Sequence, residues 1–93
     1  MTVEREDRYQ VARDVHSRTF GTELVLLDLA RGEYFSLDEL GARVWAVLAA
    51  GGSLDDAIEA LAPEYDVPWT RFQADLRALV AELVARGLLV VSR

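Results

Sequence analysis

The sequence predicts an α+β domain in which a three-stranded antiparallel sheet packs on three helices, in the order β-β-β-α-α-α. Three observations predict this class. The first half of the chain contains short apolar runs separated by turn residues, which is typical of strands. The second half carries apolar residues at helical spacing between capping residues and glycines. At 93 residues, the chain is long enough for one domain, which we expect over residues 8–93.

The strands are expected before residue 37. Residues 1–7 have little apolar content, so we expect them to fray. Tyr9–Ala12 is a short and weak strand, whereas Glu23–Leu29 is a dense β run typical of the middle of a sheet. Ala30–Gly32 supplies a turn whose glycine can take a positive φ. Glu33–Ser36 then returns as the third strand, which completes a hairpin.

The first helix is expected over about Glu39–Ala50. The segment Ser36–Glu39 has the form of a capping box, and Asp38 is an alternative N-cap. Apolar residues follow at helical spacing until Gly51 and Gly52 end the run.

Two further helices account for most of the remaining chain. Ser53 caps the second helix, which Pro63 closes or bends. The third helix begins after Pro68, carries apolar residues on one broad face and ends at Gly87, and it is the longest element expected. Leu88–Val91 forms either a last short strand or a packed tail.

Composition narrows the classes of function. Sixteen acidic residues against ten basic ones, all of them Arg, give a net charge of −6, which opposes binding to nucleic acid. The absence of cysteine removes disulfides, thiolate metal sites and cysteine nucleophiles. No apolar run approaches the roughly 20 residues of a membrane span, and the N-terminal residues lack a signal-peptide pattern. We therefore expect a cytoplasmic protein with neither a membrane nor a nucleic-acid partner.

Residues for catalysis are scarce. His16 is the only histidine, and a metal site or a general base needs further groups beside it. Gly51, Gly52 and Ser53 precede a helix but lack the rest of a phosphate-binding loop, and the next two acidic residues would repel phosphate. We expect no enzymatic activity, no cofactor and no metal.

A winged-helix DNA-binding regulator is the main alternative function. The second and third helices, joined through residues 63–68, resemble a helix-turn-helix. In the third helix, however, Arg71, Arg77 and Arg86 are set against Asp75 and Glu82, so contact with phosphates is poorly supported.

A slot for an extended peptide fits the pattern better. If Glu33–Ser36 lies at the border of the sheet, its unpaired backbone groups are a template for an added strand. The broad apolar face of the third helix would form the other wall. Strand alternation puts Phe35 and Leu37 on one face and Tyr34 and Ser36 on the other, and we expect Phe35 and Leu37 to face the helices.

The order and spacing of several short motifs resemble the PqqD-like family, the recognition elements for ribosomally synthesised and post-translationally modified peptides. The resemblance covers about Tyr9 to Val90. The motifs are Gly32–Asp38, Trp45, Leu61, Tyr65–Val67, Leu79, Leu83 and Gly87–Leu89. Members of this family often have Asn where this chain has Asp38, and either residue caps a helix.

The resemblance implies a winged-helix-like fold and a function. A precursor peptide would insert its leader as an extra antiparallel strand on the third strand, against the third helix, for a separate leader peptidase and a cyclase to act on. A free-standing chain of this size is most similar to the leader-binding proteins of lasso-peptide biosynthesis, although relatives for pyrroloquinoline-quinone precursors share the pattern. The peptide-binding residues implied are Glu33, Tyr34, Phe35, Ser36, Arg71, Phe72, Asp75, Leu76 and Leu79.

Overall fold

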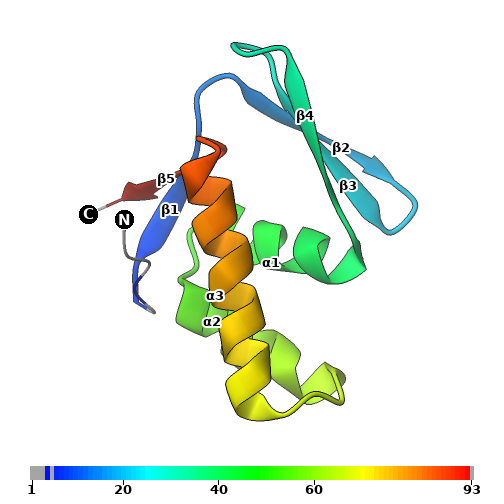
Figure 1. The fold of residues 1–93 in the computed structure, drawn as a ribbon, viewed down its shortest axis with the longest axis vertical. Coiled ribbons are helices and arrows are strands. Elements are labelled where there is room, and N and C mark those ends of the chain that lie inside the picture. Colours follow the sequence, from blue (N-terminus) through cyan, green and yellow to red (C-terminus); the bar gives the residue numbers. More distant parts are fainter. Residues whose placement is uncertain (1–3, 5, 93) are drawn as a thin grey trace.

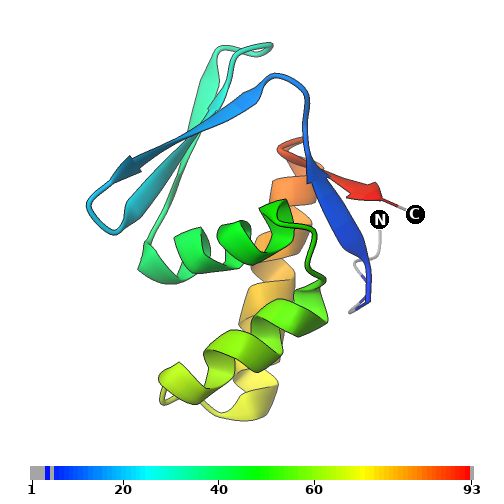
Figure 2. The same ribbon diagram turned by 180° about the vertical axis from the view of Figure 1, so that it is seen from behind.

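The protein consists of two small sheets and three helices, shown in Figures 1 and 2. The computed structural model describes Glu4 and residues 6–92, so most of the segment expected to fray, residues 1–3 and 5, lies outside the described residues. The strands are β1 (Arg8–Val11), β2 (Val15–Phe20), β3 (Glu23–Asp28), β4 (Glu33–Leu37) and β5 (Leu89–Ser92). The helices are α1 (Glu39–Ala49), α2 (Leu54–Leu61) and α3 (Trp69–Ala85), with a 3-10 turn, η1 (Ala62–Glu64), after α2.

The three-stranded antiparallel sheet and the three helices confirm the predicted fold class. The strand order in this sheet is β2-β3-β4, so the dense apolar run of β3 is central, as the sequence predicts. Leu24 pairs with Leu37 and Leu26 with Phe35 across β3 and β4. The hairpin turn is closed by Gly32, which has φ of +69° and donates its N–H to the Asp28 carbonyl at 2.8 Å.

The first strand of that sheet differs from the expectation. The short strand expected at Tyr9–Ala12 is β1, which pairs with β5 in a separate two-stranded sheet. Its place in the three-stranded sheet is taken by β2, which the sequence analysis does not identify. Only Val15 of β2 is buried, so this strand lacks the alternation of apolar and polar residues that would mark it. Residues 88–91 are largely strand rather than a tail, because β5 completes this second pair.

The two faces of the three-stranded sheet have different environments. Leu24 and Leu26 of β3 are buried on the inner face. On β4, Leu37 is buried and Phe35 packs against the core, whereas the Tyr34 side chain is 73% exposed on the outer face. The predicted orientation of Phe35 and Leu37 toward the helices is therefore confirmed.

Caps fix the ends of the helices that border the sheet. Asp38, and not Ser36, is the N-cap of α1, because Ser36 still belongs to β4; the Asp38 carboxylate accepts the Gly41 N–H at 2.8 Å. Helix α3 ends in a Schellman motif. Gly87, with φ of +74°, donates to the Val84 carbonyl at 3.0 Å, and Leu88 donates to that of Leu83 at 2.9 Å.

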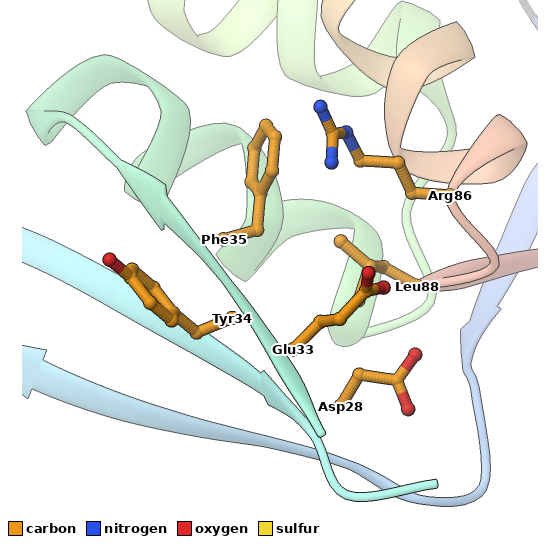
Figure 3. Close-up of a pocket in the computed structure, with 6 residues that line it drawn as sticks. All are labelled: Asp28, Glu33, Tyr34, Phe35, Arg86 and Leu88. Carbon is orange, nitrogen blue, oxygen red and sulfur yellow. The ribbon is translucent and has the colours of Figure 1, made fainter. Parts of the chain in front are cut away.

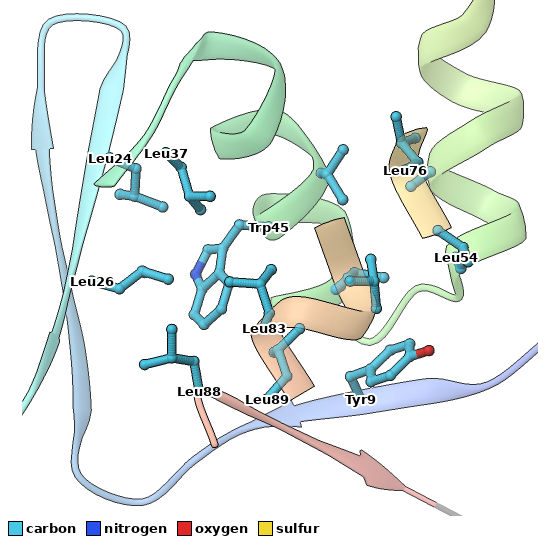
Figure 4. Close-up of a cluster of buried hydrophobic side chains, with 14 of the residues drawn as sticks. Tyr9, Leu24, Leu26, Leu37, Trp45, Leu54, Leu76, Leu83, Leu88 and Leu89 are labelled. Atoms are coloured by element: carbon cyan, nitrogen blue, oxygen red, sulfur yellow. The ribbon is translucent and has the colours of Figure 1, made fainter. Parts of the chain in front are cut away.

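A single hydrophobic core joins the sheet to the helices. Figure 4 shows Trp45 of α1 between Leu24, Leu26 and Leu37 on one side and Leu83 and Leu88 on the other. Trp45 is 5% exposed and Leu26 and Leu83 are fully buried. Because the inner face of the sheet and one face of α3 pack against the same side chains, β4 and α3 are held at a defined separation.

Candidate functional site

Strand β4 has one free edge. It pairs only with β3 within the described part of the chain, so the backbone groups on its other side are not used by the sheet. Beside this edge lies an open groove of about 370 Å³ between β4, the start of α1 and the middle of α3. Its lining residues are Phe35, Ser36, Leu37, Asp38, Leu40, Gly41, Asp75, Leu76 and Leu79.

The groove has an apolar floor that the core supports. Leu37 and Leu76 line it while being only 4% and 1% exposed, so they form a fixed base. Leu40 and Leu79 are half-buried and complete the apolar surface. An extended peptide on β4 would place alternate side chains over this surface, because successive residues of a strand point to opposite faces.

At the other end of β4 the gap to α3 is closed. The guanidinium of Arg86 lies 4.8 Å from the centroid of the Phe35 ring, a cation–π contact, and Figure 3 shows the two groups beside Leu88 and Glu33. The cavity there is only about 10 Å³, enough for about one water molecule. Arg31 of the hairpin turn also donates to the Arg86 carbonyl at 3.0 Å. Space for peptide side chains is therefore concentrated at the Leu37 end.

The structure brings together five of the nine residues predicted for the site. Phe35, Ser36, Asp75, Leu76 and Leu79 all line the groove. Of the other four, Glu33 and Tyr34 belong to β4 but line the small cavity near Arg86.

Arg71 and Phe72 do not line the groove. Arg71 is exposed beside it, with its Nε 3.7 Å from Oδ2 of Asp75. Phe72 is a core residue, 2% exposed, and its ring stacks on Tyr65 at 5.8 Å between centroids. The prediction that Phe72 forms part of the wall is not supported by this placement, because α3 turns that side chain toward α2 and η1.

Several lining residues were not predicted. Leu37, Asp38, Leu40 and Gly41 enter the groove because α1 begins directly at the end of β4. Arg86 lines the small cavity and not the groove. It follows Leu79 by seven residues, two turns along the same face of α3, so helical spacing places it on the side of the helix that faces β4.

The carboxyl groups whose pKa values are shifted lie away from the groove. The Arg43 guanidinium, with Nη2 at 2.6 Å from Oε2 of Glu64, holds the pKa of that carboxyl below its ordinary value. The backbone N–H of Ser53 lowers the pKa of Asp56 in the α2 capping box.

Within Glu4 and residues 6–92, no three or more His, Asp or Glu side chains gather as metal ligands. None of the helices described here has the length and apolar character needed to span a membrane.

The comparison with family models decides which family carries this fold. The model of the family described as Coenzyme PQQ synthesis protein D (PqqD) matches residues 23–89, from the centre of the sheet to the start of β5. The chain belongs to the PqqD family. Strand β4, all three helices and the groove between them lie within the matched residues of this PqqD-family chain, as the resemblance seen in the sequence implies.

Two solved structures share the fold of this PqqD-family chain. One is described as TbiB1 in complex with the TbiA(beta) leader peptide; it is 34% identical over 86% of this chain and 93% of its own, with a TM-score of 0.80. The other is described as lasso peptide synthetase B1 complexed with the leader peptide; it is 29% identical over 89% of this chain and 98% of its own, with a TM-score of 0.82. No curated protein is significantly similar to the chain.

Proposed function

We propose that this protein binds the leader of a ribosomally made precursor peptide and performs no chemistry on it. The leader adds as an antiparallel strand to the free edge of β4 and packs against α3. The observation that carries this proposal is the coincidence of an unpaired strand edge with an apolar groove, in a chain whose fold matches two proteins solved with leader peptides.

The two parts of the site have separate roles in this mode of binding. Backbone hydrogen bonds along β4 supply affinity with little dependence on sequence, while the groove selects alternate side chains of the ligand. The floor of Leu37 and Leu76 is held by the core, so little side-chain entropy is lost when the peptide binds. A binding protein of this kind needs no acid–base pair.

Fluorescence polarisation with a labelled TbiA(beta) leader peptide tests the proposal. Phe35→Asp places a charge in the gap between β4 and α3 and should abolish binding. Phe20→Asp is the matched control, because it makes the same substitution on β2, where the side chain is 62% exposed and does not line the groove. Circular dichroism must show that both variants fold.

The results separate the two functions considered. Peptide binding whose dependence on salt is much less steep than that of binding to duplex DNA supports the leader-binding function. Tighter binding to duplex DNA, with a steep dependence on salt, would instead favour a winged-helix regulator. A folded Phe35→Asp variant that binds the leader as well as the wild type would show that the peptide binds elsewhere.

We also propose that the bound leader is presented, in the cytoplasm, to a leader peptidase and a cyclase of a lasso-peptide pathway. The small size of the domain and the position of the groove at one sheet edge leave most of its surface accessible to such enzymes. Leader cleavage by the cognate peptidase should therefore be faster with this protein than without it, and slower again with Phe35→Asp. Equal rates in all three reactions would contradict presentation.

A further inference from the structure

We infer that the groove selects a leader with a basic residue on the N-terminal side of the apolar residue that fills it, and that Asp75 is the main group that recognises this residue. The inference rests on the proposed function and adds the charge of the ligand and its place in the peptide. The site itself is defined by the free edge of β4 and the apolar groove; the carboxylates set its preference.

The residues that line the groove carry charge of one sign only, although Arg71 lies beside them. Among its lining residues, Asp38 and Asp75 are the charged ones, and none is basic. They belong to different elements, the N-cap of α1 and the middle of α3, and both border the same apolar floor. The chain as a whole has a charge of −6, so the long-range field also favours a basic peptide.

Asp75 is the more available of the two carboxylates. Asp38 uses Oδ1 to accept the Gly41 N–H at 2.8 Å, which ties its orientation to the start of α1. Among the described residues, Asp75 is paired only with Arg71, whose Nε lies 3.7 Å from its Oδ2, and the two side chains are 61% and 75% exposed. An exposed ion pair of this kind contributes little to stability, so a basic side chain of the ligand can replace Arg71 at little cost.

The direction of β4 places this acidic rim relative to the peptide. The strand runs from Glu33 to Leu37 and leads into Asp38. In an antiparallel partner, the N-terminal residues therefore lie near Leu37 and the C-terminal residues near Glu33. The C-terminal part meets Arg86, whose guanidinium covers Phe35, together with Glu33 and Asp28 of the small cavity, so that end carries charges of both signs. A basic residue is thus favoured most in the N-terminal part of the bound strand, where both charged lining residues are acidic.

A charge scan of the peptide tests the inference. Each residue of a labelled TbiA(beta) leader peptide is replaced in turn by Lys and by Glu, and each pair is titrated against the protein by fluorescence polarisation. The quantity measured at each position is the ratio of the dissociation constant of the Glu peptide to that of the Lys peptide. We expect a position at which Lys binds about three- to five-fold more tightly than Glu, at low salt, and a ratio that falls as salt is raised. This position should lie N-terminal to the apolar residue whose replacement weakens binding most.

Substitutions at three exposed residues test whether Asp75 causes the preference for Lys. Asp75→Asn should remove the preference for Lys while leaving binding of the unmodified peptide within a few-fold. Arg71→Gln should increase the preference, because it removes the cation that competes for Asp75. Glu59→Gln, on an exposed position of α2 that does not line the groove, loses the same charge and should leave the preference unchanged.

The outcomes distinguish this inference from the function on which it rests. If peptides bind but no position prefers Lys, or if Glu59→Gln weakens the preference as much as Asp75→Asn does, the inference is wrong and leader binding stands. A preferred position on the C-terminal side of the apolar residue also overturns it. If no peptide of the series binds, the proposed function fails and the inference fails with it.

Discussion

The guanidinium of Arg86 lies 4.8 Å from the centroid of the Phe35 ring, so the last residue capping α3 is joined to the middle of β4. This contact closes one end of the space between the strand edge and the helix. The side chain is held by one further interaction, from Arg86 Nε to Oε2 of Glu82 at 3.3 Å.

Replacing Arg86 by Gln should lower the free energy of unfolding by about 0.5–1 kcal/mol, because an exposed cation–π contact is lost. Urea denaturation followed by circular dichroism measures this change. Arg77→Gln, an exposed substitution on α3 for which the described residues provide no ion pair, is the control and should have a smaller effect. Equal destabilisation by both variants would show that the Phe35 contact contributes nothing to stability.

Substitutions of Leu76 and Leu79 should have different effects on stability and on leader binding, although both residues line the groove. Leu76 is 1% exposed, so Leu76→Ala should cost about 2–4 kcal/mol of stability through loss of burial and the cavity left behind. Leu79 is half-buried, and Leu79→Ala should cost only about 1 kcal/mol. Leader binding to the folded Leu79→Ala variant should nevertheless be several-fold weaker. Calorimetry and fluorescence polarisation on the same samples check this, and unchanged affinity would remove Leu79 from the site.

The ion pair between Arg43 and Glu64 should make stability depend on pH in the acid range. Because the pKa of Glu64 is lowered in the folded protein, its contribution is present above the ordinary pKa of a Glu and is lost as the pH falls through the lowered value. The difference in Tm between the wild type and Glu64→Gln should therefore be largest near neutral pH and should vanish in strong acid. The same series with Glu59→Gln is the control. A Glu64→Gln difference that stays constant with pH would contradict the expected role of this pair.

Local sequence signals predicted the elements that have strong periodicity or clear ends. The β3–β4 hairpin follows from the apolar run of β3 and the turn at Gly32, and the end of α3 follows from Gly87. The spacing also predicts one broad apolar face on α3, and Leu76 and Leu79 of this face line the groove. These features depend on contacts between residues close in the sequence, so they can be read from spacing and turn chemistry.

Strand β2 and the placement of Phe72 could not be read in this way. Strand β2 exposes five of its six residues, and it is a strand only because its backbone pairs with β3. The side chains of Phe72 and Leu76 lie one helical turn apart and are equally apolar, yet only Leu76 reaches the groove. Their different roles depend on position along α3: Phe72, one turn nearer the N-terminus, packs on Tyr65, while Leu76 lies opposite β4 and the start of α1. Periodicity alone does not specify which turn of α3 lies beside the sheet.

By itself, the sequence determined the fold class, the family and the hairpin that ends in β4, because each of these follows from local pattern and motif order. The tertiary structure alone decided which end of the β4 edge is open. Arg86 closes the Glu33 end by covering Phe35, while the start of α1 brings Asp38 to the Leu37 end opposite Asp75. Packing of the common core around Trp45 brings these residues, which are far apart in the sequence, to the two ends of β4.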